Sequence, residues 1–204
     1  MLTRFRRTLT KFLEPLIWLF VKINVNPNLL TLSSLVIALM YLVLVTTQST
    51  KAVPLYLSLY IFSALLDSID GAVARKLGRT SLWGAFLDSL IDRICDGIFI
   101  FSLYFFDVAP LYLIVAEIIG AFLVSYSRAR GESLGVKLEG IGITERSERL
   151  ILIFLVILLN QVNKVLSTSM FYLLLLLTYI TVLQRVIYIR SKLHRPSTHI
   201  PDCF

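Results

Sequence analysis

The sequence PLYLSLYIFSALLDSIDGAVAR (residues 54–75) is an apolar stretch that ends in acidic and small residues. A second stretch, LWGAFLDSLIDRICDGIFIFSLYFF (residues 82–106), follows after a short link. Each is long enough to cross a hydrocarbon core of about 30 Å, which takes roughly 20 helical residues. The short link makes the two helices neighbours. The sequence therefore predicts a helical hairpin in a membrane.

Similar apolar stretches occur on both sides of this hairpin. Apolar residues make up 57% of the 204 residues and charged residues only 16%. We expect an all-α polytopic membrane protein with six transmembrane helices, at roughly Leu29–Val45, Pro54–Arg75, Leu82–Phe106, Ala109–Ser127, Glu148–Gln161 and Ser167–Arg190. Asn26 is a suitable cap for the first of them, and Pro27 suits a first helical position.

The segment before the first span alternates cations with apolar residues and lacks the features of a cleavable signal peptide. It predicts an amphipathic helix that lies in the headgroup region. The expected organisation is an amphipathic interfacial helix (residues 1–25), a six-helix transmembrane catalytic domain (residues 26–190) and a cytoplasmic tail (residues 191–204). Two cysteines and two histidines argue against a disulfide framework and against a zinc site.

The cations are distributed unequally across the predicted membrane. Six spans put both termini on one side, and seventeen of the Lys and Arg residues fall on that side, whereas only Lys51 and Lys164 fall on the other. The positive-inside rule then predicts a multi-pass protein of the cell membrane with both termini and the active site facing the cytoplasm. The net charge of +7 indicates membrane lipids and anionic substrates as partners, and no nucleic acid.

Four carboxylates lie in the two helices of the hairpin, close to the link that joins them. Asp67 and Asp70 are three residues apart, and Asp88 and Asp92 are four apart, so each pair shares a helix face. A charged Asp deep in a span costs roughly 2.5–3.5 kcal/mol. Hard divalent cations offset this cost best, because oxygen ligands suit Mg²⁺ or Mn²⁺. The pattern predicts a metal site formed by all four aspartates.

The same stretch carries a longer ordered pattern, Asp67–Asp70-Gly71–Ala74-Arg75–Gly84–Asp88–Asp92. This pattern resembles the signature of the CDP-alcohol phosphotransferase family. The resemblance implies two Mg²⁺ ions (or Mn²⁺) on the four aspartates, with Asp92 also acting as general base, and a homodimer. It further implies a site for CDP-diacylglycerol or CDP-archaeol formed by Asn28, Thr31, Asp67, Gly71, Ala74, Arg75 and Ser81.

The implied reaction transfers a phosphatidyl or archaetidyl group to an alcohol and releases CMP. Arginines from three separate segments could hold a phosphate on that alcohol, because Arg binds phosphate bidentately: Arg128, Arg146, Arg149 and Arg185. Electrostatics alone leaves inositol phosphate and glycerol 3-phosphate equally open as acceptors.

The motifs around these arginines are more specific than their charge. SYSRAR (residues 125–130) and ERSERL (residues 145–150) are similar to motifs of the phosphatidylinositol-phosphate and archaetidylinositol-phosphate synthase branch. By that resemblance the acceptor is 1L-myo-inositol 1-phosphate. Two positions depart from the branch: Ser147 stands where Pro is common, and Arg128 where Lys is common.

Other functions remain open at this stage. Within the family these are phosphatidylglycerol-phosphate synthase, with glycerol 3-phosphate as acceptor, and di-myo-inositol phosphate phosphate synthase. A membrane prenyltransferase would need a second Asp-rich motif, but only Asp202 follows Asp107. A metal transporter would also place acids in its spans, without needing the Gly-Ala-Arg set beside them.

Overall fold

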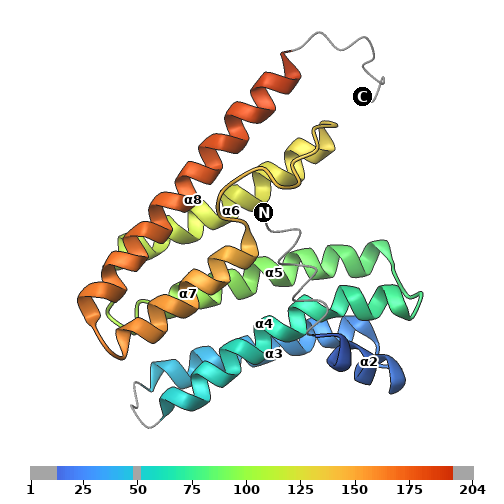
Figure 1. Cartoon of the computed structure of the whole chain (residues 1–204), viewed down its shortest axis with the longest axis horizontal. Helices are drawn as coiled ribbons and strands as arrows, with labels where there is room; N and C mark the ends of the chain where they lie inside the picture. The colour runs from blue at the N-terminus through green and yellow to red at the C-terminus, as the bar shows by residue number, and fades with distance from the viewer. Residues whose placement is uncertain (1–12, 48–51, 195–204) are drawn as a thin grey trace. The chain divides into compact units, whose positions relative to one another are not determined.

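The computed structural model describes residues 13–47 and 52–194, which form seven helices and no strand. The helices are α2 (Glu14–Lys22), α3 (Pro27–Thr46), α4 (Val53–Lys76), α5 (Leu82–Ser102), α6 (Leu111–Ser133), α7 (Arg146–Asn160) and α8 (Lys164–Leu193). They are labelled in Figure 1. All six helices expected in the transmembrane region are therefore present as helices.

Polar side chains define where these helices begin. The Asn26 side chain accepts a hydrogen bond from the Asn28 amide at 3.1 Å, and Pro27 is the first residue of α3, as predicted. Ser81 caps α5 in the same way, and Asn163 caps α8. The largest difference in bounds is the end of α6, which continues to Ser133 instead of ending at Ser127. The next largest is the end of α5, which stops at Ser102 instead of Phe106. A series of turns follows it, with a positive φ of 53° at Asp107.

Four helices, α3, α4, α6 and α8, are long and apolar enough to cross a membrane. The expected number was six. α5 contains Asp88, Asp92, Arg93 and Asp96, which make it too polar, and α7 has only 15 residues, or about 22 Å at 1.5 Å per residue. Of the predicted interfacial helix, residues 1–12 lie outside the described residues, as do residues 195–204 of the predicted tail.

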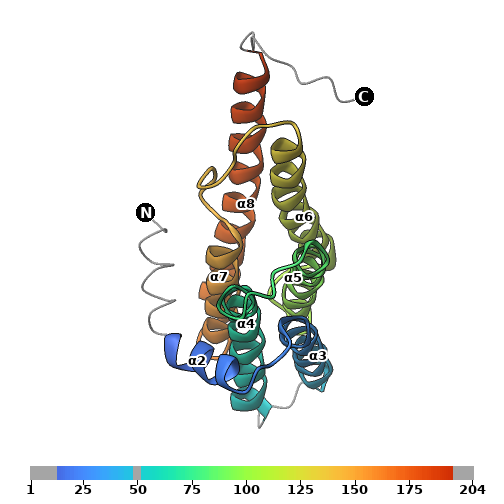
Figure 2. The same cartoon turned by 90° about the vertical axis from the view of Figure 1, so that its right-hand side faces the viewer.

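The described residues fall into two compact units that divide between Ile114 and Val115. In the first unit α3 packs along α4 and α5, and α2 packs against α4 (Figures 1 and 2). Tyr41 of α3 forms a hydrogen bond of 2.6 Å with Ser102 of α5. Ser63 of α4 donates to the carbonyl of Ser34 on α3 at 2.8 Å. These hydrogen bonds satisfy buried hydroxyls between helices, where no water is available.

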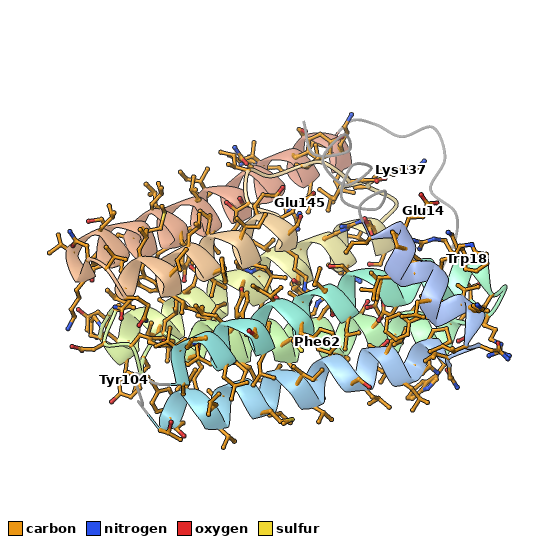
Figure 3. The ribbon with its side chains drawn as sticks, turned by 60° about the horizontal axis from the view of Figure 1, so that its bottom comes forward. Glu14, Trp18, Phe62, Tyr104, Lys137 and Glu145 are labelled. Carbon is orange, nitrogen blue, oxygen red and sulfur yellow. The ribbon has the colours of Figure 1, made fainter. Side chains whose placement is uncertain are left out.

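The short helix α2 has one apolar side packed on the hairpin. Leu13 and Ile17 contact a core cluster that includes Leu66, Ile69 and Val73 of α4. Figure 3 shows two residues on other sides of this helix: Glu14, which pairs with Lys76 at 3.6 Å, and Trp18, which is 61% exposed. This arrangement fits an interfacial helix, since an exposed Trp beside charged groups is typical of the headgroup region.

The second unit contains most of α6, together with α7 and α8. α7 and α8 form an antiparallel hairpin, visible in Figure 1, and Ser167 closes it by donating to the carbonyl of Val156 at 2.8 Å. α8 is joined to α6 by two further hydrogen bonds: Thr178 donates to the buried carboxylate of Glu117 at 2.8 Å, and the Tyr179 hydroxyl donates to the Ala116 carbonyl at 2.9 Å.

Candidate functional site

Three of the four predicted carboxylates converge in the α4–α5 hairpin. One oxygen of each of Asp67, Asp88 and Asp92 lies within 4.8 Å of the others. Asp67 is buried, and Asp88 and Asp92 are half-buried. The spacing of three and four residues therefore does place acids of the two helices on facing sides, as the sequence indicated.

The fourth carboxylate, Asp70, is held by other groups. Thr31 of α3 donates its hydroxyl hydrogen to one Asp70 oxygen at 2.5 Å, and the backbone N–H of Gly71 donates to the other oxygen at 2.5 Å. The distance from the Thr31 hydroxyl is in the range for a hydroxyl that donates to an ionised carboxylate. Each carboxylate oxygen keeps a second lone pair, so the role of Asp70 as a metal ligand stays a prediction.

The group fits a divalent cation. Carboxylate oxygens are the ligands that Mg²⁺ and Mn²⁺ prefer. Ligands on opposite sides of Mg²⁺ are about 4.2 Å apart, twice the usual bond length of 2.0–2.1 Å. Oxygens of Asp67, Asp88 and Asp92 within 4.8 Å of one another can meet this spacing by small rotations of their side chains. Without a cation, three partly buried negative charges would repel each other strongly.

Two arginines lie beside the carboxylates. The Arg93 guanidinium donates to the Ser89 carbonyl at 2.7 Å and is 3.4 Å from an Asp92 oxygen. Arg75 is exposed at the end of α4, and its guanidinium would be 3.4 Å from a Cβ placed on Gly71. The Arg93 charge offsets part of the acidic charge at Asp92.

The residues predicted to bind a CDP-lipid belong to three helices that meet near the carboxylates. Asn28 and Thr31 are in the first turns of α3, whereas Ser81 caps α5. A Cβ at Gly84 would lie 3.0 Å from the Ser81 hydroxyl and 3.1 Å from the Asn28 amide oxygen. Gly84 thus allows α3 and α5 to approach closely. Ala74 is half-buried on α4, one turn from Asp70.

The predicted phosphate-binding arginines belong to the second unit, and Arg185 of α8 is their centre. Its side chain is only 2% exposed. The guanidinium donates to the Ile141 carbonyl at 2.9 Å and to the Val124 carbonyl, and it is 3.8 Å from a Glu145 oxygen. Arg185 therefore joins α6, α8 and the segment before α7, where Figure 3 labels Lys137 and Glu145.

Arg128 and Arg149 lie near enough to Arg185 to interact with it electrostatically. Arg149 is buried, whereas Arg128 pairs with Glu132 at 3.0 Å on the surface of α6. Arg146 is half-buried at the first position of α7. The structure thus brings three of the four arginines together from separate segments.

Several contacts of this cluster were not expected from the sequence. The sequence pattern predicts neither the ion pair of Arg185 with Glu145 nor the two carbonyls that hold the Arg185 guanidinium. Glu145 and Arg185 are 40 residues apart, so no local spacing relates them.

The helices and the carboxylate group define an integral membrane protein with an acidic site suited to divalent metal. The chain belongs to the CDP-alcohol phosphatidyltransferase family, whose model matches residues 24–189. It is accordingly a transferase.

Relatives with curated names agree with this assignment. The chain is 40% identical to the archaetidylinositol phosphate synthase of Aeropyrum pernix over 85% of this chain and 88% of that one. It is 34% identical to the archaetidylinositol phosphate synthase of Pyrococcus horikoshii over 95% and 98% of the two chains. The phosphatidylinositol phosphate synthase of Corynebacterium glutamicum is 36% identical over 72% and 68%.

Solved structures show the same fold. The phosphatidylinositol phosphate synthase of Mycobacterium tuberculosis in complex with manganese and citrate superposes with a TM-score of 0.74 at 23% identity, over 87% of this chain and 88% of that one. The same enzyme with CDP-DAG bound gives a TM-score of 0.72 at 22% identity, over 93% and 98%.

Proposed function

We propose that this chain transfers a phosphatidyl or archaetidyl group from a CDP-lipid to a hydroxyl of 1L-myo-inositol 1-phosphate and releases CMP. The observation that carries the proposal is the convergence of Asp67, Asp88 and Asp92 in the α4–α5 hairpin. The relatives support the choice of substrates, since their names include both archaetidylinositol and phosphatidylinositol phosphate synthases. Those names also leave both lipid types, CDP-archaeol and CDP-diacylglycerol, as donors.

The carboxylates are assigned to metal and proton chemistry. Asp67, Asp70, Asp88 and Asp92 would hold two Mg²⁺ or Mn²⁺ ions, which when bound neutralise charge on the diphosphate and make CMP a better leaving group. Asp92 would also accept the proton of the attacking hydroxyl. The hydroxyl oxygen forms a bond to the phosphorus that carries the lipid, and the bond from this phosphorus to the oxygen of CMP breaks.

The remaining predicted residues are assigned to binding. The CDP-lipid site comprises Asn28, Thr31, Asp67, Gly71, Ala74, Arg75 and Ser81, of which Gly71 leaves room beside the Arg75 guanidinium. The acceptor phosphate would be bound by Arg128, Arg146, Arg149 and Arg185. Burial of two of these arginines favours this role, because phosphate binding is stronger where water is excluded.

The proposed topology has six spans, with residues 26–190 as one catalytic domain, both termini and the active site in the cytoplasm, and a homodimeric assembly. α5 and α7 would then cross the membrane in contact with other helices, which can shield their charges and short length. The distribution of Lys and Arg supports the orientation.

The test is an assay of the purified chain with Mg²⁺ and either CDP-diacylglycerol or CDP-archaeol. Inositol 1-phosphate, glycerol 3-phosphate, inositol and serine are compared as acceptors, and CMP release is measured. We expect turnover with inositol 1-phosphate. Turnover with glycerol 3-phosphate but not with inositol 1-phosphate would contradict the acceptor assignment and indicate a phosphatidylglycerol-phosphate synthase.

A further inference from the structure

A cavity of about 320 Å³ lies in the second unit, where the segment before α7 meets α7 and α8. It is lined by Ile143, Thr144, Glu148, Ile151, Leu152 and Leu177. Its volume is at the lower end of the range for small-molecule sites, roughly 300–1,000 Å³. Most of the lining is apolar, and two of the lining residues, Thr144 and Glu148, carry side-chain oxygen atoms.

These two oxygens distinguish the cavity from an ordinary packing defect. Thr144 is only 1% exposed, and its hydroxyl oxygen has no hydrogen-bond partner among the described residues. Glu148 accepts from Ser147 with one carboxylate oxygen at 3.2 Å, but its other oxygen is buried without a partner. Buried polar atoms are nearly always hydrogen-bonded, and a ligand with hydroxyl groups could supply the missing partners of this pair.

Two residues that line the cavity are close along the chain or through one hydrogen bond to residues of the arginine cluster. The backbone N–H of Thr144 donates to the Thr181 hydroxyl at 3.0 Å, and Thr181 is one turn before Arg185 on α8. Glu148 directly precedes Arg149, which is buried. One molecule could therefore place a phosphate on the arginines and a hydroxylated body in the cavity.

We propose that Thr144 and Glu148 bind ring hydroxyls of the phosphorylated acceptor and thereby select a cyclic polyol phosphate over glycerol 3-phosphate. This inference rests on the proposed function and names the residues that set its acceptor specificity. Glu148 accepts from one hydroxyl, and Thr144 can donate to or accept from another. The C–H face of the ring packs against the side chains of Ile151 and Leu177.

A lipid chain is the other class of occupant that an apolar cavity could take. It would fill the volume but would leave both oxygens without a hydrogen bond, which is unfavourable. A polyol ring satisfies the oxygens and covers the apolar lining at the same time. A site that hydrogen-bonds substrate hydroxyls also rejects analogues that lack them much more strongly than an apolar pocket can.

The inference is tested with Thr144→Val and Glu148→Gln in the full chain. The KM and kcat for inositol 1-phosphate are measured, together with the inhibition constant of glycerol 3-phosphate against it. We expect each variant to raise the KM for inositol 1-phosphate about five- to tenfold, the usual effect of one hydrogen bond, with kcat close to the original value. The inhibition constant of glycerol 3-phosphate should stay unchanged, because this compound has no ring to occupy the cavity.

Two further variants separate recognition from a merely structural role. Thr144→Ser keeps the hydroxyl and should retain the original KM. Glu139→Gln removes a carboxylate from an exposed position of the same segment and should change neither constant. A variant that fails to fold is detected by its thermal midpoint, in which case Thr144→Ser and Glu148→Asp are compared instead.

Three results would overturn the inference. The first is an unchanged KM for inositol 1-phosphate in both Thr144→Val and Glu148→Gln, and the second is an equal change in both acceptor constants. The third is a rise in the KM for the CDP-lipid alone, which would indicate a lipid chain in the cavity.

If the original chain shows no turnover with inositol 1-phosphate, the proposed function fails by itself. Calorimetric titration with inositol 1-phosphate then decides the site: weaker binding in the variants supports it, and absence of binding to the original chain overturns it.

Discussion

The hydrogen bond between Thr31 and Asp70 gives a prediction that the sequence alone could not supply. Both residues are buried, and the donor and acceptor oxygens are 2.5 Å apart. Thr31→Val keeps a similar shape but removes the donor, so of the two hydrogen bonds to Asp70 described above the variant keeps only the one from the Gly71 amide. Hydrogen bonds to charged groups contribute about 1.5–3 kcal/mol, and we expect the variant to lose about this much stability.

The loss should be visible in thermal unfolding of the purified chain. For a chain of this size 1 kcal/mol corresponds to about 2–4 °C, which predicts a decrease of about 3–12 °C in EDTA. Freed from Thr31, the Asp70 carboxylate can turn toward the other acids, and bound Mn²⁺ should then recover part of the difference by mass action. Apparent midpoints are compared at one scan rate, because unfolding of membrane proteins is often irreversible.

Thr46→Val is the matched control, because it makes the same change at an exposed position of the same helix. The Thr46 hydroxyl donates only within α3, to the Val43 carbonyl at 2.7 Å. If Thr31→Val and Thr46→Val had indistinguishable midpoints in EDTA, the hydrogen bond to Asp70 would not stabilise the site, and the reasoning would be refuted.

Three further predictions concern the rest of the chain. Asp92→Asn should lower CMP release by at least about 10²-fold, the usual contribution of a general base, while CDP-lipid binding measured by titration persists; near-normal turnover would contradict the base assignment. Gly142→Ala should destabilise the chain by about 1–3 kcal/mol, because a Cβ there would be 2.5 Å from a methyl group of Thr181 on α8. Gly140→Ala is the control: a Cβ there would have nothing within 4 Å, so its thermal midpoint should fall less. Glu117→Leu removes the acceptor of the Thr178 hydroxyl and should lower the midpoint more than Glu117→Gln, which keeps a carbonyl oxygen; equal effects would show that this hydrogen bond contributes little.

Features that depend on nearby residues were predictable from the sequence. The start of α3 at Pro27 follows from local capping chemistry. The meeting of Asp67 with Asp88 and Asp92 follows from helical periodicity and a short link, which leave two adjacent helices little choice of facing sides. The lengths of the apolar stretches likewise predicted six helices, and most of the predicted ends lie within a few residues of the observed ends.

Features that depend on packing between distant segments were not predictable. The bond from Thr31 to Asp70 requires a particular rotation of α3 against α4, which no spacing within either helix determines. Arg185 was expected to face a phosphate, but its geometry depends on carbonyls of α6 and of a loop residue more than 40 positions away. The cavity at Thr144 arises in the same way, from a loop that bends back onto α8.

The polarity of α5 has a consequence for how the protein is made. A helix that carries Asp88, Asp92, Arg93 and Asp96 has a high free energy of insertion when it leaves the translocon by itself. α3 and α4 precede it in synthesis, and α3 packs along α5, where Tyr41 forms a hydrogen bond with Ser102. We therefore expect α5 to enter the bilayer only together with these two earlier helices, as one cotranslational unit, and truncations that remove α3 should leave it outside.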